Sequence, residues 1–182
     1  MRPSWDVYFL KMCKAVAERS HDSNTQMGAV IVDGYHRIVS TGYNGFPPGV
    51  LDRVWPSRRG DTVWLMEDKV TGEMSLLINH DNVDPGVLKD WKHTGDVDKY
   101  MVMNHAELNA IISAREDLHG CTLYCLSHPC ANCAMAIIAA GIKKVIIEDM
   151  PVSGKWGVSF VIAKEMFKQA CVEVITIDVP ED

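Results

Sequence analysis

The stretch TLYCLSHPCANCAMAIIAAGIKKVIIE, residues 122–148, decides the fold that we expect for this chain. It opens with a short apolar run typical of a buried strand. It continues with an apolar segment of helical length, which Gly141 ends, and closes on a second apolar run. Two strands joined by a helix need a crossover connection, which places them parallel in one sheet. The stretch therefore predicts an α/β protein.

The neighbouring segments extend this pattern in both directions. Helices are expected over residues 105–116 and 157–170, and a last strand over 172–178. Upstream, residues 5–20 place apolar side chains at helical spacing, and GAVIVDGYHRIVSTGYNG, residues 28–45, indicates two strands joined by a tight turn. The expected architecture is a three-layer α-β-α fold whose mixed sheet has an N-terminal hairpin and parallel C-terminal strands.

Residues 60–98 fit this alternation of strands and helices less well. TVWLMEDKVTGEMSLLIN, residues 62–79, predicts a second hairpin that turns at Thr71-Gly72, and residues 84–96 predict a short helix followed by a loop. A length of 182 residues suits one domain with a sizeable core. We expect a single domain over residues 1–182, with 60–98 as a variable insertion.

Composition narrows the range of functions. Hydrophobic residues make up 47% of the chain, and no signal peptide or membrane span is evident, so we expect a cytoplasmic protein with no membrane partner. The formal charge of −6 argues against a protein that binds long nucleic acids, because contacts with many phosphates need a concentrated basic surface. The six cysteines come without a secretion signal, which favours metal binding or reduced core thiols over disulfides.

A set of metal-ligating side chains gathers at two predicted helix starts. HPCANC places Cys130 and Cys133 one helical turn apart, and NHAELNA places His105 at the start of the preceding helix. One imidazole and two thiolates make three protein ligands, the number found in catalytic zinc sites, whereas structural zinc sites are closed by four. Cys-x-x-Cys alone also occurs in structural zinc sites and redox pairs. The combination with His105 favours catalytic zinc.

Glu107 lies two residues after His105 and is expected to move protons rather than bind metal. A carboxylate beside a zinc-activated water can act first as base and then as acid. His-x-Glu followed by Pro-Cys-x-x-Cys is a signature of zinc deaminases acting on cytosine or adenine. His128 is less suitable as a ligand, because it precedes Pro129 in an extended link.

Several further motifs carry a resemblance to a known family. RSHDSNTQMGAVIV, GYNGFPPG, HAELNAI, HPCANCAMAII and AGIKKVI occur in the order and context used by deoxycytidylate (dCMP) deaminases of the cytidine deaminase-like superfamily. The resemblance covers most of the chain outside residues 60–98. It implies hydrolytic conversion of dCMP to dUMP with release of ammonia, supplying dUMP for thymidylate synthesis. It also implies a zinc ion held by His105, Cys130 and Cys133, with Glu107 as the proton shuttle.

The resemblance further implies residues that contact the nucleotide substrate. These are Asn44 in the YNG turn, Asn24 and Gln26 in the loop before the first strand, Ala106, and the backbone around Ser127. Asparagine is also favoured in turns with positive φ, so a purely conformational role for Asn44 stays open.

Regulation is implied in the same way. Family members are typically homohexamers that dCTP activates and dTTP inhibits, at a nucleotide site that here includes Tyr43, Asn44 and Gly45. Mg²⁺ would accompany the regulatory nucleotide.

Some positions depart from the family pattern or allow two interpretations. His80 and His93 could bind a second, structural zinc or be solvated loop histidines, and Trp156 could supply the aromatic side chain that relatives place near the substrate base. Three arginines are candidate phosphate partners or a solvated basic run: Arg53, Arg58 and Arg59.

Three alternative functions stay open. An altered pocket at Trp156 would suit a dCMP substituted at C5 of the ring. A polynucleotide deaminase would need a basic groove and stacking aromatic side chains, which the acidic composition disfavours. A zinc-stabilised binding module without catalysis would not need Glu107.

Overall fold

The structure is a computed structural model. It describes residues 2–22, 24–50, 63–77, 84–97, 99–148 and 156–180. The chain divides into two compact units. The larger unit comprises Met1–Ser20, Thr25–Gly45 and Asn104–Asp182, and the smaller unit comprises His21–Asn24 and Phe46–Met103.

The larger unit is built on a five-stranded sheet with the order β2-β1-β6-β7-β8. Its strands are β1 (Gly28–Val32), β2 (Ile38–Tyr43), β6 (Thr122–Cys125), β7 (Lys144–Glu148) and β8 (Glu173–Ile177). β1 pairs antiparallel with β2 and with β6, while β6, β7 and β8 run parallel. The predicted N-terminal hairpin, mixed sheet and parallel C-terminal strands are confirmed.

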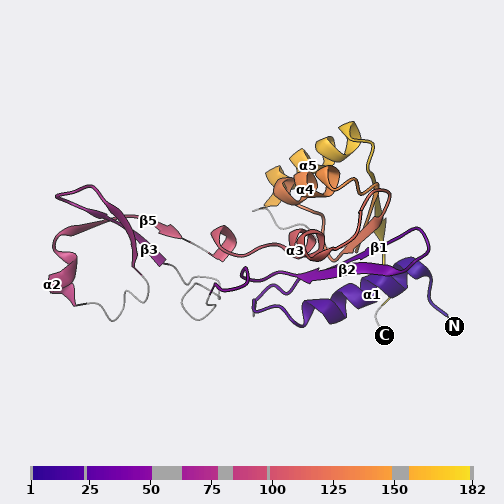
Figure 1. Cartoon of the computed structure of the whole chain (residues 1–182), viewed down its shortest axis with the longest axis horizontal. Helices are drawn as coiled ribbons and strands as arrows, with labels where there is room; N and C mark the ends of the chain where they lie inside the picture. The colour runs from indigo at the N-terminus through magenta and orange to yellow at the C-terminus, as the bar shows by residue number, and fades with distance from the viewer. Residues whose placement is uncertain are drawn as a thin grey trace. The chain divides into compact units, whose positions relative to one another are not determined.

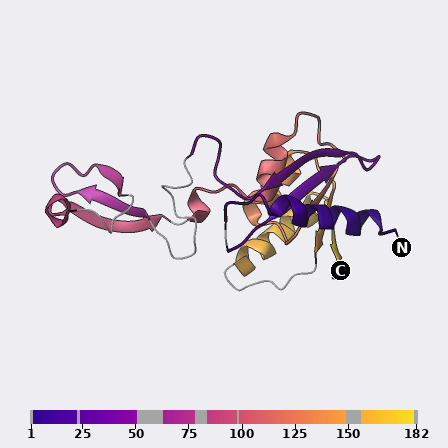
Figure 2. The same cartoon turned by 90° about the horizontal axis from the view of Figure 1, so that it is seen from below.

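Helices cover both faces of this sheet (Figure 1). Helix α1 (Trp5–Ala17) lies on one face and is seen across the strands in Figure 2. Helices α3 (Ala106–Ser113), α4 (Ala131–Ala139) and α5 (Gly157–Gln169) lie on the other face. The larger unit therefore has the predicted three-layer α-β-α architecture.

Two apolar cores, one on each side of the sheet, hold these layers together. All five residues of β1 are buried. Ala29 and Ile31 belong to the core under α3 and α4, whereas Val30 and Val32 belong to the core under α1. Alternate residues of a strand face opposite sides of a sheet, so a strand covered on both faces is apolar throughout.

The smaller unit contains a three-stranded antiparallel sheet with the order β4-β3-β5. Strands β3 (Val63–Asp68) and β4 (Met74–Leu77) form the predicted hairpin, and Gly72 in its turn has a positive φ of 72°. A short helix, α2 (Pro85–Leu88), confirms the prediction there. The loop predicted after it is wrong, because Trp91–Val97 forms strand β5, which pairs with β3. A single 3₁₀ turn, η3 (Lys99–Met101), follows β5.

Two further sequence expectations can be compared with the structure. All six cysteines are free thiols, and all but Cys171 are buried. Among the residues that the structure describes, no helix has both the length and the apolar character to cross a membrane.

Candidate metal centre

The three predicted ligands lie at the amino-terminal ends of two helices. His105 is the N-cap residue immediately before α3, Cys130 is the N-cap residue immediately before α4, and both have extended backbone conformations. Neither side chain caps its own helix by a hydrogen bond, so both donor atoms are directed elsewhere. Cys133 lies in the first turn of α4 and is buried.

The donor atoms of these residues converge on one point. The Sγ atoms of Cys130 and Cys133 each lie 3.4 Å from Nδ1 of His105, and all three donor atoms lie within 4.8 Å of one another. Zinc–sulfur bonds of about 2.3 Å and zinc–nitrogen bonds of about 2.0 Å at a tetrahedral angle would place the two donor atoms about 3.5 Å apart. The cluster therefore fits a zinc ion with three protein ligands.

The three side chains of the cluster shift one another's pKa values. Hydrogen bonds from Cys133 and His105 lower the pKa of the Cys130 thiol and favour its thiolate. The hydrogen bond to Cys130, together with burial, raises the pKa of the Cys133 thiol. The Cys130 hydrogen bond also raises the pKa of His105. Metal binding would displace protons from the ligands, because they coordinate in their deprotonated forms.

Glu107 lies beside the cluster, in the first turn of α3, and its side chain is buried. Burial raises the pKa of its carboxyl, while the neighbouring His105 lowers it. The Cys133 side chain also lowers the pKa of this carboxyl. A buried carboxyl beside three metal-ligating atoms has the position that a proton shuttle needs.

Helix α3 is fixed to strand β2 by polar contacts that the sequence analysis did not identify. Ser40 donates a hydrogen bond to the Ala110 carbonyl (2.7 Å), and the Asn109 side chain donates to the Tyr43 carbonyl (2.7 Å). The Asn104 amide in turn donates to the Asn109 oxygen (3.1 Å). The signal in the sequence was Asn109, a polar residue within the apolar run LNAII, residues 108–112.

Asn44 supports the loop before β1 rather than standing free. Its side-chain oxygen accepts a hydrogen bond from the Met27 backbone N–H (2.8 Å), and its nitrogen donates to the Thr25 carbonyl (2.9 Å). Ser20 donates to the Asn44 carbonyl (2.9 Å). The amide still has one N–H and one oxygen lone pair for a ligand.

Two other predicted substrate residues flank the metal ligands. Ala106 is the first residue of α3, and its side chain is buried in the core. Ser127 is half-buried, and its carbonyl accepts a hydrogen bond from the Cys125 thiol (3.2 Å).

The remaining predicted nucleotide contacts occupy different surroundings. Asn24 belongs to the smaller unit, where its backbone N–H donates to Asp22 (2.9 Å). Gln26 is exposed, and its side chain donates to the Ser20 carbonyl (3.4 Å). The backbone of Gly45 pairs with Asn104 in an isolated antiparallel bridge, at N···O distances of 3.1 and 2.9 Å.

Trp156 lies against the candidate metal centre. It immediately precedes α5, and its ring is 5.7 Å from the His105 ring, centroid to centroid, in an edge-on arrangement. An aromatic side chain therefore adjoins the site, although it comes from a later position than the family pattern suggested.

The other histidines that the structure describes do not join the cluster. His128 is buried and lies between Phe160 and Phe167, with ring centroids 5.3 and 6.2 Å away. His93 is exposed on β5, and its Nε2 lies 3.0 Å from Asp96. Within the described ranges, the metal-ligating trio of His105, Cys130 and Cys133 is the one group of its kind. Outside those ranges lie His80, Arg53, Arg58 and Arg59.

Solved structures confirm the fold. A dCMP deaminase from the cyanophage S-TIM5 aligns with a TM-score of 0.59 and 19% identity, over 97% of this chain and 100% of that chain. The same phage enzyme is known in complex with dCMP and dUMP. At this identity the likeness establishes a shared fold.

Sequence comparisons establish the family. An uncharacterised deaminase from Aliivibrio fischeri is 34% identical over 96% of this chain and 94% of its own length. Human deoxycytidylate deaminase is 38% identical over 78% of this chain, although the match spans 63% of the human protein. The family model described as the cytidine and deoxycytidylate deaminase zinc-binding region matches residues 3–149. The chain therefore belongs to the cytidine and deoxycytidylate deaminase family of hydrolases.

Proposed function

We propose that this protein is a zinc-dependent dCMP deaminase, which converts dCMP and water to dUMP and ammonia. The observation that carries the proposal is the convergence of His105, Cys130 and Cys133 beside the buried carboxyl of Glu107. The relatives named deoxycytidylate deaminase support dCMP as the substrate. The product dUMP would supply thymidylate synthesis.

In this proposal His105, Cys130 and Cys133 hold the zinc ion. A bound zinc ion supplies Lewis acidity, which makes a water molecule more acidic and more nucleophilic at neutral pH. Glu107 accepts a proton from the attacking water, whose oxygen bonds to C4 of the ring, and delivers that proton to the ring nitrogen N3. It then carries the remaining hydroxyl proton to the amino group, which leaves as ammonia when the C4–N bond breaks. Burial of Glu107 keeps solvent away from these transfers.

The substrate is held by groups around this centre. Trp156 forms one wall of the base pocket, since its ring adjoins His105. The free hydrogen-bonding positions of Asn44 face a base edge or a sugar hydroxyl, and the backbone near Ser127 receives the amino group that leaves. Asn24 and Gln26 contribute to the nucleotide-binding loop, and Ala106 borders the base.

A panel of substrates tests the activity. Ammonia release is followed with dCMP, deoxycytidine, dCTP and a cytosine-containing oligonucleotide, for the wild type and for Glu107→Gln. We expect turnover of dCMP alone, and a loss of at least a hundredfold in kcat for Glu107→Gln, because general acid–base catalysis contributes that much. Zinc content, measured in parallel, should be equal in the two proteins.

Other outcomes of this panel identify the alternatives. Turnover of the oligonucleotide would indicate a polynucleotide deaminase. Nucleotide binding without ammonia release, unchanged by Glu107→Gln, would indicate a binding module and contradict the proposal.

We also propose a regulated homohexamer, on the basis of the GYNG motif that the chain shares with the family. The regulatory nucleotide, with Mg²⁺, would bind at Tyr43, Asn44 and Gly45. In an assay at subsaturating dCMP, dCTP should raise the rate and dTTP should lower it. Light scattering would report the oligomer size, and an unregulated monomer would contradict this part of the proposal.

A further inference from the structure

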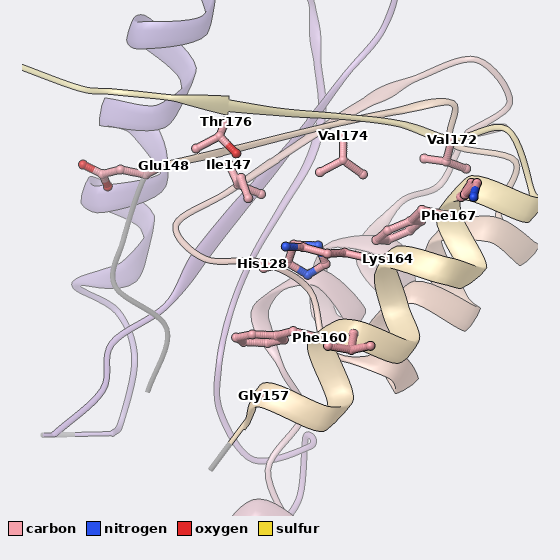
Figure 3. Close-up of a pocket in the computed structure, with 12 residues that line it drawn as sticks. His128, Ile147, Glu148, Gly157, Phe160, Lys164, Phe167, Val172, Val174 and Thr176 are labelled. Carbon is pink, nitrogen blue, oxygen red and sulfur yellow. The ribbon is translucent and has the colours of Figure 1, made fainter. Parts of the chain in front are cut away.

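A cavity lies in the larger unit, between α5 and strands β7 and β8 (Figure 3). Its volume is about 670 Å³, within the range of small-molecule binding sites. The four residues of the candidate metal centre are absent from its lining. The cavity is thus a separate feature of the fold.

Most of the cavity wall is apolar. Two aromatic side chains of α5, Phe160 and Phe167, line it together with aliphatic side chains: Ile147 from β7, Val174 from β8, and Val172, which precedes β8. A cavity lined by aromatic and aliphatic side chains favours an apolar, aromatic body.

His128 brings one polar atom to this apolar wall. The side chain is 8% exposed, and Figure 3 shows its ring between α5 and the strands. Nδ1 lies 2.8 Å from the Pro129 carbonyl, which can only accept, so Nδ1 carries the hydrogen and Nε2 is an acceptor. Nε2 is buried and has no hydrogen-bond partner among the described residues. Because a buried polar atom without a partner is costly, this acceptor calls for a donor from a ligand.

Positive charge lies beside this acceptor. Lys164 and Lys168 line the cavity from α5, and neither forms an ion pair within the part of the chain that the structure describes. The acidic residue in the lining, Glu148, is already paired with Lys14 at 2.6 Å. The two lysines can therefore attract an anionic group of a bound molecule.

We propose that this cavity binds an aromatic carboxylate that also carries an O–H or N–H donor. Its ring lies between Phe160 and the strands, its donor group bonds Nε2 of His128, and its carboxylate pairs with Lys164 and Lys168. The four features that define the ligand class are the cavity volume, the apolar walls, the unpartnered acceptor and the unpaired lysines.

A set of three related probes tests each feature with the zinc-loaded full chain. 6-Hydroxy-2-naphthoate has an aromatic body, a donor and a carboxylate, whereas 2-naphthoate lacks the donor and 2-naphthol lacks the carboxylate. Dissociation constants are measured by titration calorimetry. We expect 6-hydroxy-2-naphthoate to bind about tenfold more tightly than either of the others, the effect of one hydrogen bond or ion pair. Equal affinity of the three probes, or no binding, would overturn the proposal.

Variants locate the probe in this cavity. Lys164→Met combined with Lys168→Met should weaken 6-hydroxy-2-naphthoate about tenfold and leave 2-naphthol unchanged. The control is Lys89→Met combined with Lys92→Met, which removes the same charge from the smaller unit and should change neither probe. Equal effects of the two double variants would overturn the proposal.

Two further variants address the wall and the acceptor. Val174→Phe fills the cavity and should abolish binding, while a retained zinc content shows that the chain still folds. His128→Phe keeps an aromatic ring but removes the acceptor, so it should erase the difference between 6-hydroxy-2-naphthoate and 2-naphthoate. Binding that survives Val174→Phe, or a hydroxyl preference that survives His128→Phe, would contradict the assignment.

Discussion

At the scale of single residues, two of the three proposed metal ligands occupy positions that usually stabilise helices. Helices commonly begin at Ser, Thr, Asp or Asn, whose side chains bond the first free N–H groups. Here the N-cap residues of α3 and α4 are His105 and Cys130, and neither side chain provides such a bond. Each helix therefore lacks a contribution of about 0.5–2 kcal/mol. The geometry favours metal binding at the expense of local stability.

Trp156 is the residue we expect to set preference at C5 of the pyrimidine ring. Trp156→Ala should enlarge the pocket next to His105. It should lower kcat/KM for dCMP, and raise kcat/KM for 5-hydroxymethyl-dCMP because removal of the indole ring makes room for the C5 substituent. The ratio of the two kcat/KM values should shift by about tenfold, the effect of a group of one or two heavy atoms in a pocket.

Trp156→Phe serves as the control, since it keeps an aromatic wall and should shift the ratio less. If the ratio is unchanged in Trp156→Ala, the ring has no role in excluding C5 substituents. If the wild type already prefers 5-hydroxymethyl-dCMP, the dCMP assignment itself is in error.

The sequence was sufficient to predict the ligand cluster, but not the contacts that support it. Spacing and helix starts pointed to His105, Cys130 and Cys133, because three donors of these types suit one metal. The contact from Asn109 to Tyr43 joins residues 66 positions apart. Local patterns carry no information about such a partner, so the link required the three-dimensional structure.

At the scale of elements, the close approach of α3 to β2 determines where His105 and Glu107 lie. A Cβ atom at Gly42 would come 2.2 Å from the Ala110 nitrogen and 2.4 Å from the Ala106 carbonyl oxygen. Both are backbone atoms of the helix, which cannot move aside independently. Glycine at position 42 thus lets the helix that carries the site pack directly on the strand.

Gly42→Ala should displace α3 and destabilise the protein by about 1–3 kcal/mol, the usual cost of overpacking. We expect zinc affinity to fall as well, because His105 moves with the helix. Urea unfolding measures the first effect and competition with a chelator the second.

Gly34→Ala is the matched control, because no atom lies within 4 Å of an added Cβ at that position. Its stability should stay within about 0.5 kcal/mol of the wild type. Similar behaviour of the two alanine variants would show that the packing of α3 on β2 does not control the site.

The elements themselves were largely predictable where apolar periodicity was strong. The segment that became β5 failed this criterion, since WKHTGDV contains lysine, glycine and aspartate and lacks an apolar alternation. It is a strand because β3 offers hydrogen-bonding partners, across a register shift at Leu65/Met66. Tertiary pairing here outweighs the local preference of the residues.

At the scale of the whole molecule, the region that the family model matches ends before the larger unit of the structure does. The matched region, residues 3–149, ends before Trp156, α5 and β8. These later parts complete the sheet, border the metal centre and build the cavity beside α5.

Zinc dependence of dCMP deamination is the central claim. The most direct test strips the metal with a chelator, adds zinc back in steps and measures dUMP formation together with bound zinc per chain. Activity should fall to background on stripping, return in proportion to bound zinc and level off at one zinc per chain, because His105, Cys130 and Cys133 form one site. Full dCMP turnover by the zinc-free protein, or no turnover with one zinc bound, would contradict the account.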